Sequence, residues 1–100
     1  MPEPARPNAV LIDPADNVVT VTCEIPAAGA VTYSGGGTTH ELTAMDAIPS
    51  GHKVARHVID EGGIVRKYGE AIGRATRPIA AGRHVHAHNV QSLRAQAERL

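Results

Sequence analysis

The sequence predicts one mainly β domain, in which short strands meet at sharp turns. Apolar residues account for 42% of the 100 residues, yet the chain has two tyrosines, no phenylalanine and no tryptophan, so small aliphatic side chains must build the core. Branched aliphatic side chains suit strands. The pattern Ile-x-x-Gly-x-x-Val also recurs, and its glycine allows the positive φ of a tight turn. A chain of this length has room for a single domain with a modest core.

The repeated pattern begins at Ile48, Ile59 and Ile79, and an imperfect copy with a displaced glycine begins at Ile25. Each copy predicts a buried isoleucine, a turn, and a strand whose first inward residue is the valine. The three full copies start 11 and 20 residues apart, which is too irregular for a solenoid. We therefore expect a compact body of short strands.

Before the repeats, three prolines among the first seven residues predict a flexible tail over residues 1–8. The domain itself is expected to cover residues 9–91. Residues 10–12 form a short apolar run, and residues 18–23 have the strongest strand signal in the chain. The turn-forming residues between these two runs predict a hairpin or a corner. Cys23, at the end of the second run, is expected to be buried and inert.

The remaining segments comprise one glycine-rich stretch and two helical patterns. Residues 34–39 lack the terminal lysine of a phosphate-binding loop, so we expect a mobile loop between strands, with ordering over a ligand left open. Residues 54–59 predict one or two helical turns at most. From Val90 onward, apolar residues recur on one helical face, which predicts a short helical tail over residues 92–100. This tail is expected to pack on its own domain or on a partner.

The charge and cysteine content restrict the function. Ten basic residues balance ten acidic ones, so the chain lacks the basic excess of a nucleic-acid or anionic-membrane binder. Its single cysteine excludes an intrachain disulfide and cysteine-pair metal motifs. No apolar run approaches the ~18 to 20 residues that span a bilayer. These features predict a cytoplasmic protein that binds neither nucleic acid nor membrane.

Half of the six histidines lie in one short stretch. If this stretch is extended, it directs His84, His86 and His88 to one face. Two imidazoles spaced in this way can bind one metal ion, with the shell completed by a carboxylate, a third histidine or a partner chain. The alternative is that these histidines form hydrogen bonds in a polar cleft or on an exposed strand.

Two other polar groups are candidates for function. His52 follows a Pro-Ser-Gly turn and could act as an acid or a base, while the adjacent Lys53 could hold a substrate carboxylate. Residues 67–70 combine a cation, a phenol and a carboxylate with a turn glycine. Taken alone, the residues of both groups favour a solvated surface over a functional role. His40 and His57 have no partner nearby in the sequence, so we expect them to be surface or locally hydrogen-bonded residues.

Four motifs together carry a family resemblance. In order and approximate spacing, they resemble the SAF-type N-terminal domain of the altronate and galactarate dehydratase family over roughly residues 9–91. The resemblance implies a β-clip fold, which is a compact arrangement of short, bent strands. The motifs are Asp16-Asn17-Val18, Gly51-His52-Lys53-Val54-Ala55, Lys67-Tyr68-Gly69-Glu70-x-Ile72-Gly73-x-Ala75-Thr76 and His84-Val85-His86-x-His88-Asn89-Val90.

The resemblance also implies a lyase activity. In fused family members a much larger catalytic domain follows, whereas this chain ends at Leu100. It is therefore similar to the separately encoded small subunits of some members, among them the lyases that act on sulfolactate. The implied reaction is β-elimination of hydroxide or sulfite from a hydroxy acid such as altronate, galactarate or sulfolactate. A large catalytic subunit is the implied partner, the isolated chain is expected to be inactive, and a homo-oligomer is left open.

For the site, the resemblance implies that His52 and Lys53 lie at the substrate carboxylate and the transferred proton, without separate acid and base roles. Lys53, Tyr68 and Asn89 would bind the substrate. A divalent metal, Fe²⁺ or Mn²⁺, would contact His86 and His88, with His84 as a further candidate, and would be shared with or held by the large subunit. The alternative reading is a non-catalytic module that binds a carboxylate or a metal, or acts as a scaffold.

Overall fold

A computed structural model describes residues 6–93 of the chain, and these residues form nine short strands. The mainly β architecture predicted from the sequence is confirmed. Within the described residues, no helix has the length and apolar character needed to cross a membrane. The strands are β1 (Ala9–Val10), β2 (Val18–Val21), β3 (Ala30–Gly35), β4 (Thr38–Thr43), β5 (Lys53–Ala55), β6 (Ile64–Lys67), β7 (Glu70–Ala75), β8 (His84–Val85) and β9 (Val90–Ser92).

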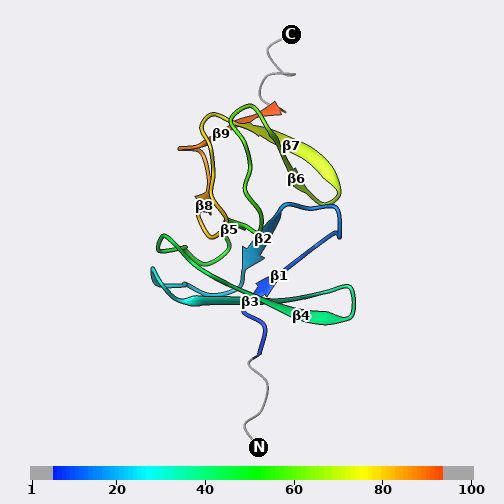
Figure 1. Cartoon of the computed structure of the whole chain (residues 1–100), viewed down its shortest axis with the longest axis vertical. Helices are drawn as coiled ribbons and strands as arrows, with labels where there is room; N and C mark the ends of the chain where they lie inside the picture. Colours follow the sequence, from blue (N-terminus) through cyan, green and yellow to red (C-terminus); the bar gives the residue numbers. More distant parts are fainter. Residues whose placement is uncertain (1–5, 94–100) are drawn as a thin grey trace, which may run out of the picture.

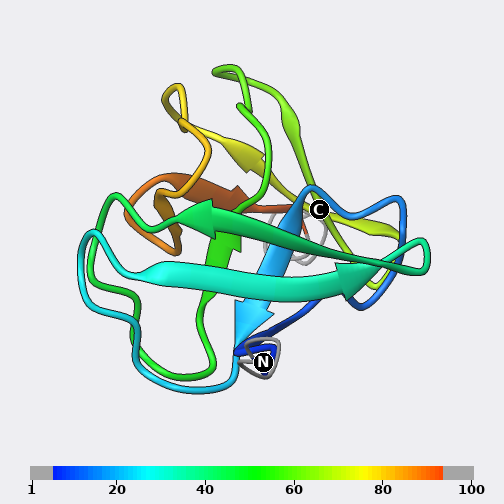
Figure 2. The same cartoon turned by 60° about the horizontal axis from the view of Figure 1, so that its bottom comes forward.

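The strands are arranged in three layers (Figure 1). A four-stranded antiparallel sheet in the order β1-β2-β5-β8 forms the middle layer. The β3–β4 hairpin covers one side of it, and the sheet β6-β7-β9 covers the other. Figure 2 shows β3 and β4 side by side as they cross in front of β2. The site described below lies along the β8 edge of the middle sheet.

Each side of the middle sheet has its own hydrophobic core. Along β2, Val19 and Val21 face the hairpin while Val18 faces the other sheet, because successive side chains of a strand point to opposite faces. Burial on both faces explains the unbroken apolar character of this segment. The hairpin-side core contains Ala9, Val19, Val21, Ile25, Val31, Tyr33, Ala44, Ile48 and Val54, and the β7-side core contains Val18, Ala55, Ile59, Val65, Ala75, Ile79 and Val85.

The repeated pattern has the structure expected from the sequence. Its isoleucines are buried and join in two antiparallel bridges, Ile25 with Ile48 in the hairpin-side core and Ile59 with Ile79 in the β7-side core. Each core therefore contains one pair of repeats. The valines that end the four copies, Val31, Val54, Val65 and Val85, are all completely buried.

The turns within the repeats have positive φ angles, which favour glycine. Gly51, Gly62 and Gly82 have φ angles of 83°, 80° and 90°, in the region that most residues avoid. In the imperfect copy, Ala28 occupies the equivalent position with a φ of 70°. At Gly82 the space is also closed, because an added Cβ would overlap the carbonyl oxygen of Thr43. The chain path at this turn thus excludes every other residue type without rearrangement.

The beginning of the described chain is anchored by Asn8. Its backbone N–H donates to Thr32 O, and its side-chain oxygen accepts from Thr32 N at 2.8 Å. Its carbonyl accepts from Thr22 N at 2.8 Å. Asn8, which we assigned to the tail, is thus held between β3 and the end of β2, while residues 1–5 of the predicted tail lie outside the described residues. The predicted hairpin or corner is confirmed by the antiparallel pairing of β1 with β2.

Two local predictions are wrong. Strand β2 ends at Val21, so Cys23 lies in the bend beyond it and is exposed rather than buried. Residues 34–39 do not form a mobile loop, because β3 and β4 pair up to Gly35 opposite Thr38. Gly36 and Gly37, with φ angles of 62° and 80°, form the two-residue turn between them. Consecutive positive φ values match the twist of a tight hairpin.

The helical pattern over residues 54–59 is wrong, and the one from Val90 begins as a strand, with helix assigned among the described residues at Leu93 alone. Lys53–Ala55 is strand β5, bonded on both sides in the middle sheet, so residues 54–59 contain no helical turn. Val90–Ser92 is strand β9, and Val90 pairs with Ala75 of β7. A short apolar pattern fits a helix and a strand equally well, and tertiary pairing decides between them. Residues 94–100, which make up most of the predicted tail, lie outside the described residues.

Candidate functional site

The pairing of β5 with β8 brings distant histidines together. In this register Lys53 lies opposite Val85, so one further step along the ladder places His52 opposite His86. His52 Nδ1 lies 2.9 Å from His84 Nε2. The rings of His52 and His86 stack with their centroids 4.3 Å apart and an interplanar angle of 20°. Residues from two copies of the repeat therefore build one imidazole cluster.

The donor set of this cluster fits a metal ion. His52, His84 and His86 each offer a ring nitrogen, and the three nitrogens lie within 4.8 Å of one another. Two imidazole nitrogens bound to one ion at about 2.0 to 2.1 Å are roughly 3 Å apart. The 2.9 Å separation between His52 Nδ1 and His84 Nε2 matches that requirement. We refer to these three residues as the histidine cluster.

The backbone on either side of Val85 is fixed by two polar side chains. Asp46 Oδ2 accepts from His84 N at 3.0 Å, and Asp46 Oδ1 accepts from Arg83 Nη1 at 2.9 Å. Asn89 is 4% exposed. Its Oδ1 accepts from His86 N at 3.0 Å, and its Nδ2 donates to His84 O at 2.8 Å. Because both ends of the Asn89 amide bond to backbone, its contact with substrate stays a prediction.

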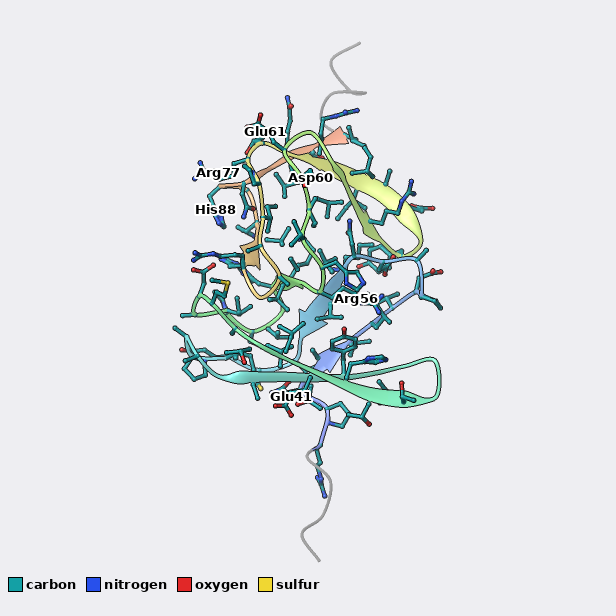
Figure 3. The ribbon with its side chains drawn as sticks, in the orientation of Figure 1. Glu41, Arg56, Asp60, Glu61, Arg77 and His88 are labelled. Atoms are coloured by element: carbon teal, nitrogen blue, oxygen red, sulfur yellow. The ribbon has the colours of Figure 1, made fainter. Side chains whose placement is uncertain are left out.

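His88 lies outside the histidine cluster. Strand β8 ends at Val85, so the alternation assumed for an extended stretch does not continue beyond His86. The His88 ring is tilted by 38° against that of His84, with centroids 5.2 Å apart. Figure 3 shows His88 at the outer side of the molecule. The structure thus brings His52 rather than His88 to His84 and His86, which fits the alternative of a third histidine from elsewhere in the chain.

The electrostatics of the site favour the neutral forms of His84 and His86. Burial lowers the pKa of His84, and the neighbouring His52, His88 and His86 lower it further, while the Asp46 carboxylate acts in the opposite direction. The pKa of His86 is also lowered, first by partial desolvation and then by His52 and Lys53. Neutral imidazole is the form that binds metals and accepts protons.

An open groove of about 800 Å³ runs beside the histidine cluster. Lys53 is half-buried in its wall, and its pKa is lowered by burial and then by the nearby charge of Lys67. His86 belongs to both the cluster and the groove. The other lining residues are Tyr68, Glu70, Ala71, Ile72, Ala87, Val90, Ser92 and Leu93. The groove therefore combines an apolar floor with a cation, a phenol, a carboxylate and an imidazole.

The rim of this groove depends on a buried carboxylate. Tyr68 and Gly69 form the β6–β7 turn, with φ angles of 60° and 72°. Their backbone N–H groups donate to the carboxylate of Asp16 at 3.1 and 2.8 Å. Asp16 is 2% exposed, whereas Tyr68 is 60% exposed, with Lys67 Nζ 5.0 Å from its ring centroid. The turn that presents Tyr68 is thus set by a residue from the start of the chain.

Asn17 also holds the β6–β7 hairpin, through two hydrogen bonds to the backbone of β6. Its Nδ2 donates to Ile64 O at 2.8 Å, and its Oδ1 accepts from Arg66 N at 2.9 Å, as a neighbouring strand would. Arg56, which lies in the middle of the molecule in Figure 3, donates to the carbonyl of Asp16 at 2.9 Å. The Asp16-Asn17-Val18 motif therefore acts structurally, by holding the β6–β7 hairpin in place.

The two remaining histidines lie away from the cluster. His40 Nε2 lies 3.0 Å from Gly35 O, and its ring stacks on Tyr33 at 5.2 Å, so its local hydrogen bonding is confirmed. His57 is exposed, as expected. Neither residue contributes to the groove.

The fold and the site together define a class of protein: a small, layered β domain that presents imidazoles and a half-buried lysine beside an open groove. The chain belongs to the altronate/galactarate dehydratase SAF domain family, whose model matches residues 7–93. The resemblance carried by the four motifs is therefore confirmed, with slightly wider bounds than expected.

Curated relatives include proteins named as lyase subunits and a much longer dehydratase. The chain is 45% identical over 56 residues to (2R)-sulfolactate sulfo-lyase subunit alpha of Chromohalobacter salexigens, covering 56% of this chain and 60% of that protein. It is 45% identical over 53 residues to the subunit of the same name from Paracoccus pantotrophus, covering 53% and 79%. With the altronate dehydratase of Escherichia coli it shares 35% identity over 83 residues, covering 83% of this chain and 16% of that enzyme. The match thus spans about three fifths of the first relative's length.

Proposed function

We propose that this chain is the small subunit of a cytoplasmic lyase, which eliminates water or sulfite from a hydroxy acid together with a large catalytic subunit. Its family and the lyase names of its relatives support the reaction class. The observation that carries the proposal is that Lys53 and His86 line one groove, while His86 also joins His52 and His84. An acid such as altronate, galactarate or sulfolactate has the charge and size for this groove.

The substrate carboxylate is bound by Lys53 in this proposal. An ammonium group that is partly removed from water attracts an anion more strongly than an exposed one does. Charge-assisted hydrogen bonds also exceed neutral ones in strength. Tyr68, on the rim, offers a phenol to the hydroxyl groups of the acid. Lys53 therefore fixes the end of the substrate next to which a proton must leave.

The proton is handled by the imidazoles. Elimination removes a proton from the carbon beside the carboxylate and needs a donor for the leaving group. His86 faces the groove and can accept a proton there, while His52 Nδ1 shares a hydrogen bond with His84 Nε2, so a metal-free cluster can also pass a proton between those two rings. When bound, a divalent cation such as Fe²⁺ or Mn²⁺ supplies a Lewis acid for charge developing on the carboxylate. The histidine cluster is the donor set in residues 6–93 that would hold it, and the coordinating ring nitrogens would then be ligands rather than proton acceptors.

Co-expression with the large subunit tests the function. We expect elimination from a hydroxy acid with both chains present and none with this chain alone. Lys53→Met should lower kcat/KM by about 10- to 150-fold, the value of a hydrogen bond to a charged group. Lys67→Met makes the same change outside the groove lining and should have a much smaller effect. Equal effects of the two variants would contradict the role of Lys53, and activity of the isolated chain would contradict the two-subunit enzyme.

A further inference from the structure

We propose that two copies of this chain pair antiparallel along the outer edge of β4, so that their β3–β4 hairpins join in one four-stranded sheet. Thr39 of each copy then lies opposite Glu41 of the other, and the two His40 residues lie opposite each other. The pairing goes beyond the proposed function, because it uses neither the groove nor the histidine cluster. It gives a specific form to the homo-oligomer that the sequence left open.

The backbone groups of Thr39 and Glu41 point away from β3. In an antiparallel pair, residues that bond to each other alternate with residues whose N–H and C=O face outward. Thr32 faces outward on β3, since its N–H donates to Asn8 Oδ1 at 2.8 Å and its carbonyl accepts from Asn8 N at 2.9 Å. Glu41 lies opposite Thr32, so its N–H and C=O face the outer edge of β4. Thr39, two residues earlier on the same strand, has the same direction.

Side chains close the outer edges of three other strands, but not the edge of β4. Among the described residues, no hydrogen bond reaches the backbone of Thr39 or Glu41 from outside the hairpin. Unpaired groups along a strand edge are a template for a further strand. At the three closed edges an amide or carboxylate replaces the missing neighbour: Asn8 at β3, Asn17 at β6, and Asp46 with Asn89 at β8.

The second hairpin of the fold shows which element fits such an edge. The two hairpins end alike, because Ala44 after β4 and Ala75 of β7 each exchange two backbone hydrogen bonds with the turn that starts their own hairpin. Next to Ala75, antiparallel β9 covers the outer edge of β7, with Gln91 opposite Arg74. In the described part of the chain, β4 has no strand at the equivalent place. A short antiparallel strand therefore fits there.

The sequence of β4 suits pairing with a second copy of itself. Its six residues include no proline, lysine or bulge, which commonly protect a sheet edge. With His40 at the two-fold axis, each Glu41 carboxylate can accept a hydrogen bond from the Thr39 hydroxyl of the other copy. A pair centred on Glu41 would instead bring two carboxylates together. Gly82 lies against the carbonyl of Thr43 and closes the far end of the edge.

The position of β4 leaves the groove accessible. The β3–β4 hairpin and the β6-β7-β9 sheet lie on opposite sides of the middle sheet (Figure 1). No described residue of β3 or β4 belongs to the groove lining. A large subunit over the groove and a second copy at β4 therefore do not compete. Because a strand pair of this length is smaller than a standard interface of about 1,600 Å², the pairing should depend on protein concentration.

Sedimentation equilibrium of the full chain without any partner tests the pairing. From about 10 μM to 1 mM protein, the average mass should rise from 10.5 kDa toward twice that value. Over the same range, hydrogen exchange at the amides of Thr39 and Glu41 should slow, because pairing protects them. A chain that stays monomeric up to about 1 mM would overturn the inference, as would self-association without protection of these two amides.

Substitutions in β4 test the edge and the register. Glu41→Pro removes an outward N–H, while the groups that bond to β3 belong to its neighbours, so the variant should fold and remain monomeric. Thr39→Lys places a cation opposite Glu41 of the other copy twice in each dimer, and should tighten the dimer by about 2- to 30-fold. The matched control is Ser34→Lys, at an exposed position opposite Thr39 but one strand farther from the edge. It should leave the dissociation constant nearly unchanged.

The variants can also contradict the pairing. A folded Glu41→Pro protein that dimerises normally would overturn it, and so would equal effects of Thr39→Lys and Ser34→Lys. If Glu41→Pro fails to fold by circular dichroism, Thr39→Glu decides, since it opposes two carboxylates and should weaken the dimer. Loss of large-subunit binding in Glu41→Pro with unchanged self-association would show that β4 binds that subunit instead. No measurement here uses substrate, so failure of the pairing leaves the lyase proposal intact, and the reverse also holds.

Discussion

His52 Nδ1 lies 2.9 Å from His84 Nε2, although 32 residues separate them in sequence. The contact is a product of the structural repeat. His52 follows the turn glycine of one copy, and His84 comes two residues after the turn glycine of another. The strands that these turns start pair as β5 and β8. The same glycine turns that build the core therefore also position the candidate site.

The turn at Gly82 should tolerate substitution least. Gly82→Ala places a side chain at a φ of 90° and against Thr43 O, so we expect a loss of at least about 3 kcal/mol in unfolding free energy. Gly62→Ala is the control, because its φ of 80° is similar but no atom lies within 4 Å of the new Cβ. It should cost about 1 to 2 kcal/mol. Chemical denaturation measures both, and equal losses would show that the contact with Thr43 is unimportant.

The predictable part of the fold is the part that repeats. Buried Ile48, Ile59 and Ile79 and their turn glycines could be predicted because a local pattern fixes each turn. The layer order could not, since it depends on which strands pair. Where the segment is short, periodicity also misled: Val90 fits a helical face, yet it pairs with Ala75. Cys23 was misplaced because an apolar run does not show where its strand ends.

The Asp16 carboxylate should be a major determinant of stability. It accepts from Tyr68 N, Gly69 N and Asp13 N while almost fully buried. Asp16→Ala leaves these donors unsatisfied, so we expect a loss of about 2 to 4 kcal/mol. The amides of Tyr68 and Gly69 should also exchange hydrogen faster. Asp60→Ala, at an exposed position (Figure 3), is the matched control and should change unfolding by less than about 0.5 kcal/mol.

The sequence could predict which types of residue form the candidate site, but not which of the histidines come together. His84, His86, His52 and Lys53 could be chosen from the sequence because charged and imidazole groups follow turn glycines there. Which imidazoles meet depends on the β5–β8 register and on the end of β8 at Val85. Register is a long-range property, and a single-residue change reverses the side-chain faces. This is why His52 joins the cluster in place of His88.

Asp46 should make stability depend on acid pH. The hydrogen bond from His84 N, together with Arg83, holds its pKa below the ordinary value of about 3.9. A lowered folded pKa adds stability above the unfolded pKa, and this stability is lost as the pH falls through the folded pKa. In buffer with EDTA, Asp46→Asn should be less stable at pH 7 by under about 1 kcal/mol, because the carboxylate is partly exposed. The two proteins should converge as the pH falls below the ordinary carboxyl pKa and through the lowered folded pKa of Asp46; a difference that stays constant through this acid range would contradict the assignment.

Substitutions of Asn89 can distinguish a structural role of this residue from a direct contact with substrate. Its amide joins His86 N to His84 O across a turn and is 4% exposed. If it acts by holding this turn, Asn89→Ala should lower the free energy of unfolding by about 1 to 3 kcal/mol. It should also weaken the binding of a divalent probe ion such as Co²⁺ at the histidine cluster. Asn89→Asp keeps the acceptor for His86 N but turns a carboxylate oxygen toward His84 O, so it should recover little of either. A direct substrate contact would instead raise KM in the two-chain enzyme while stability and metal affinity stay unchanged, and that pattern would restore the expectation drawn from the family resemblance.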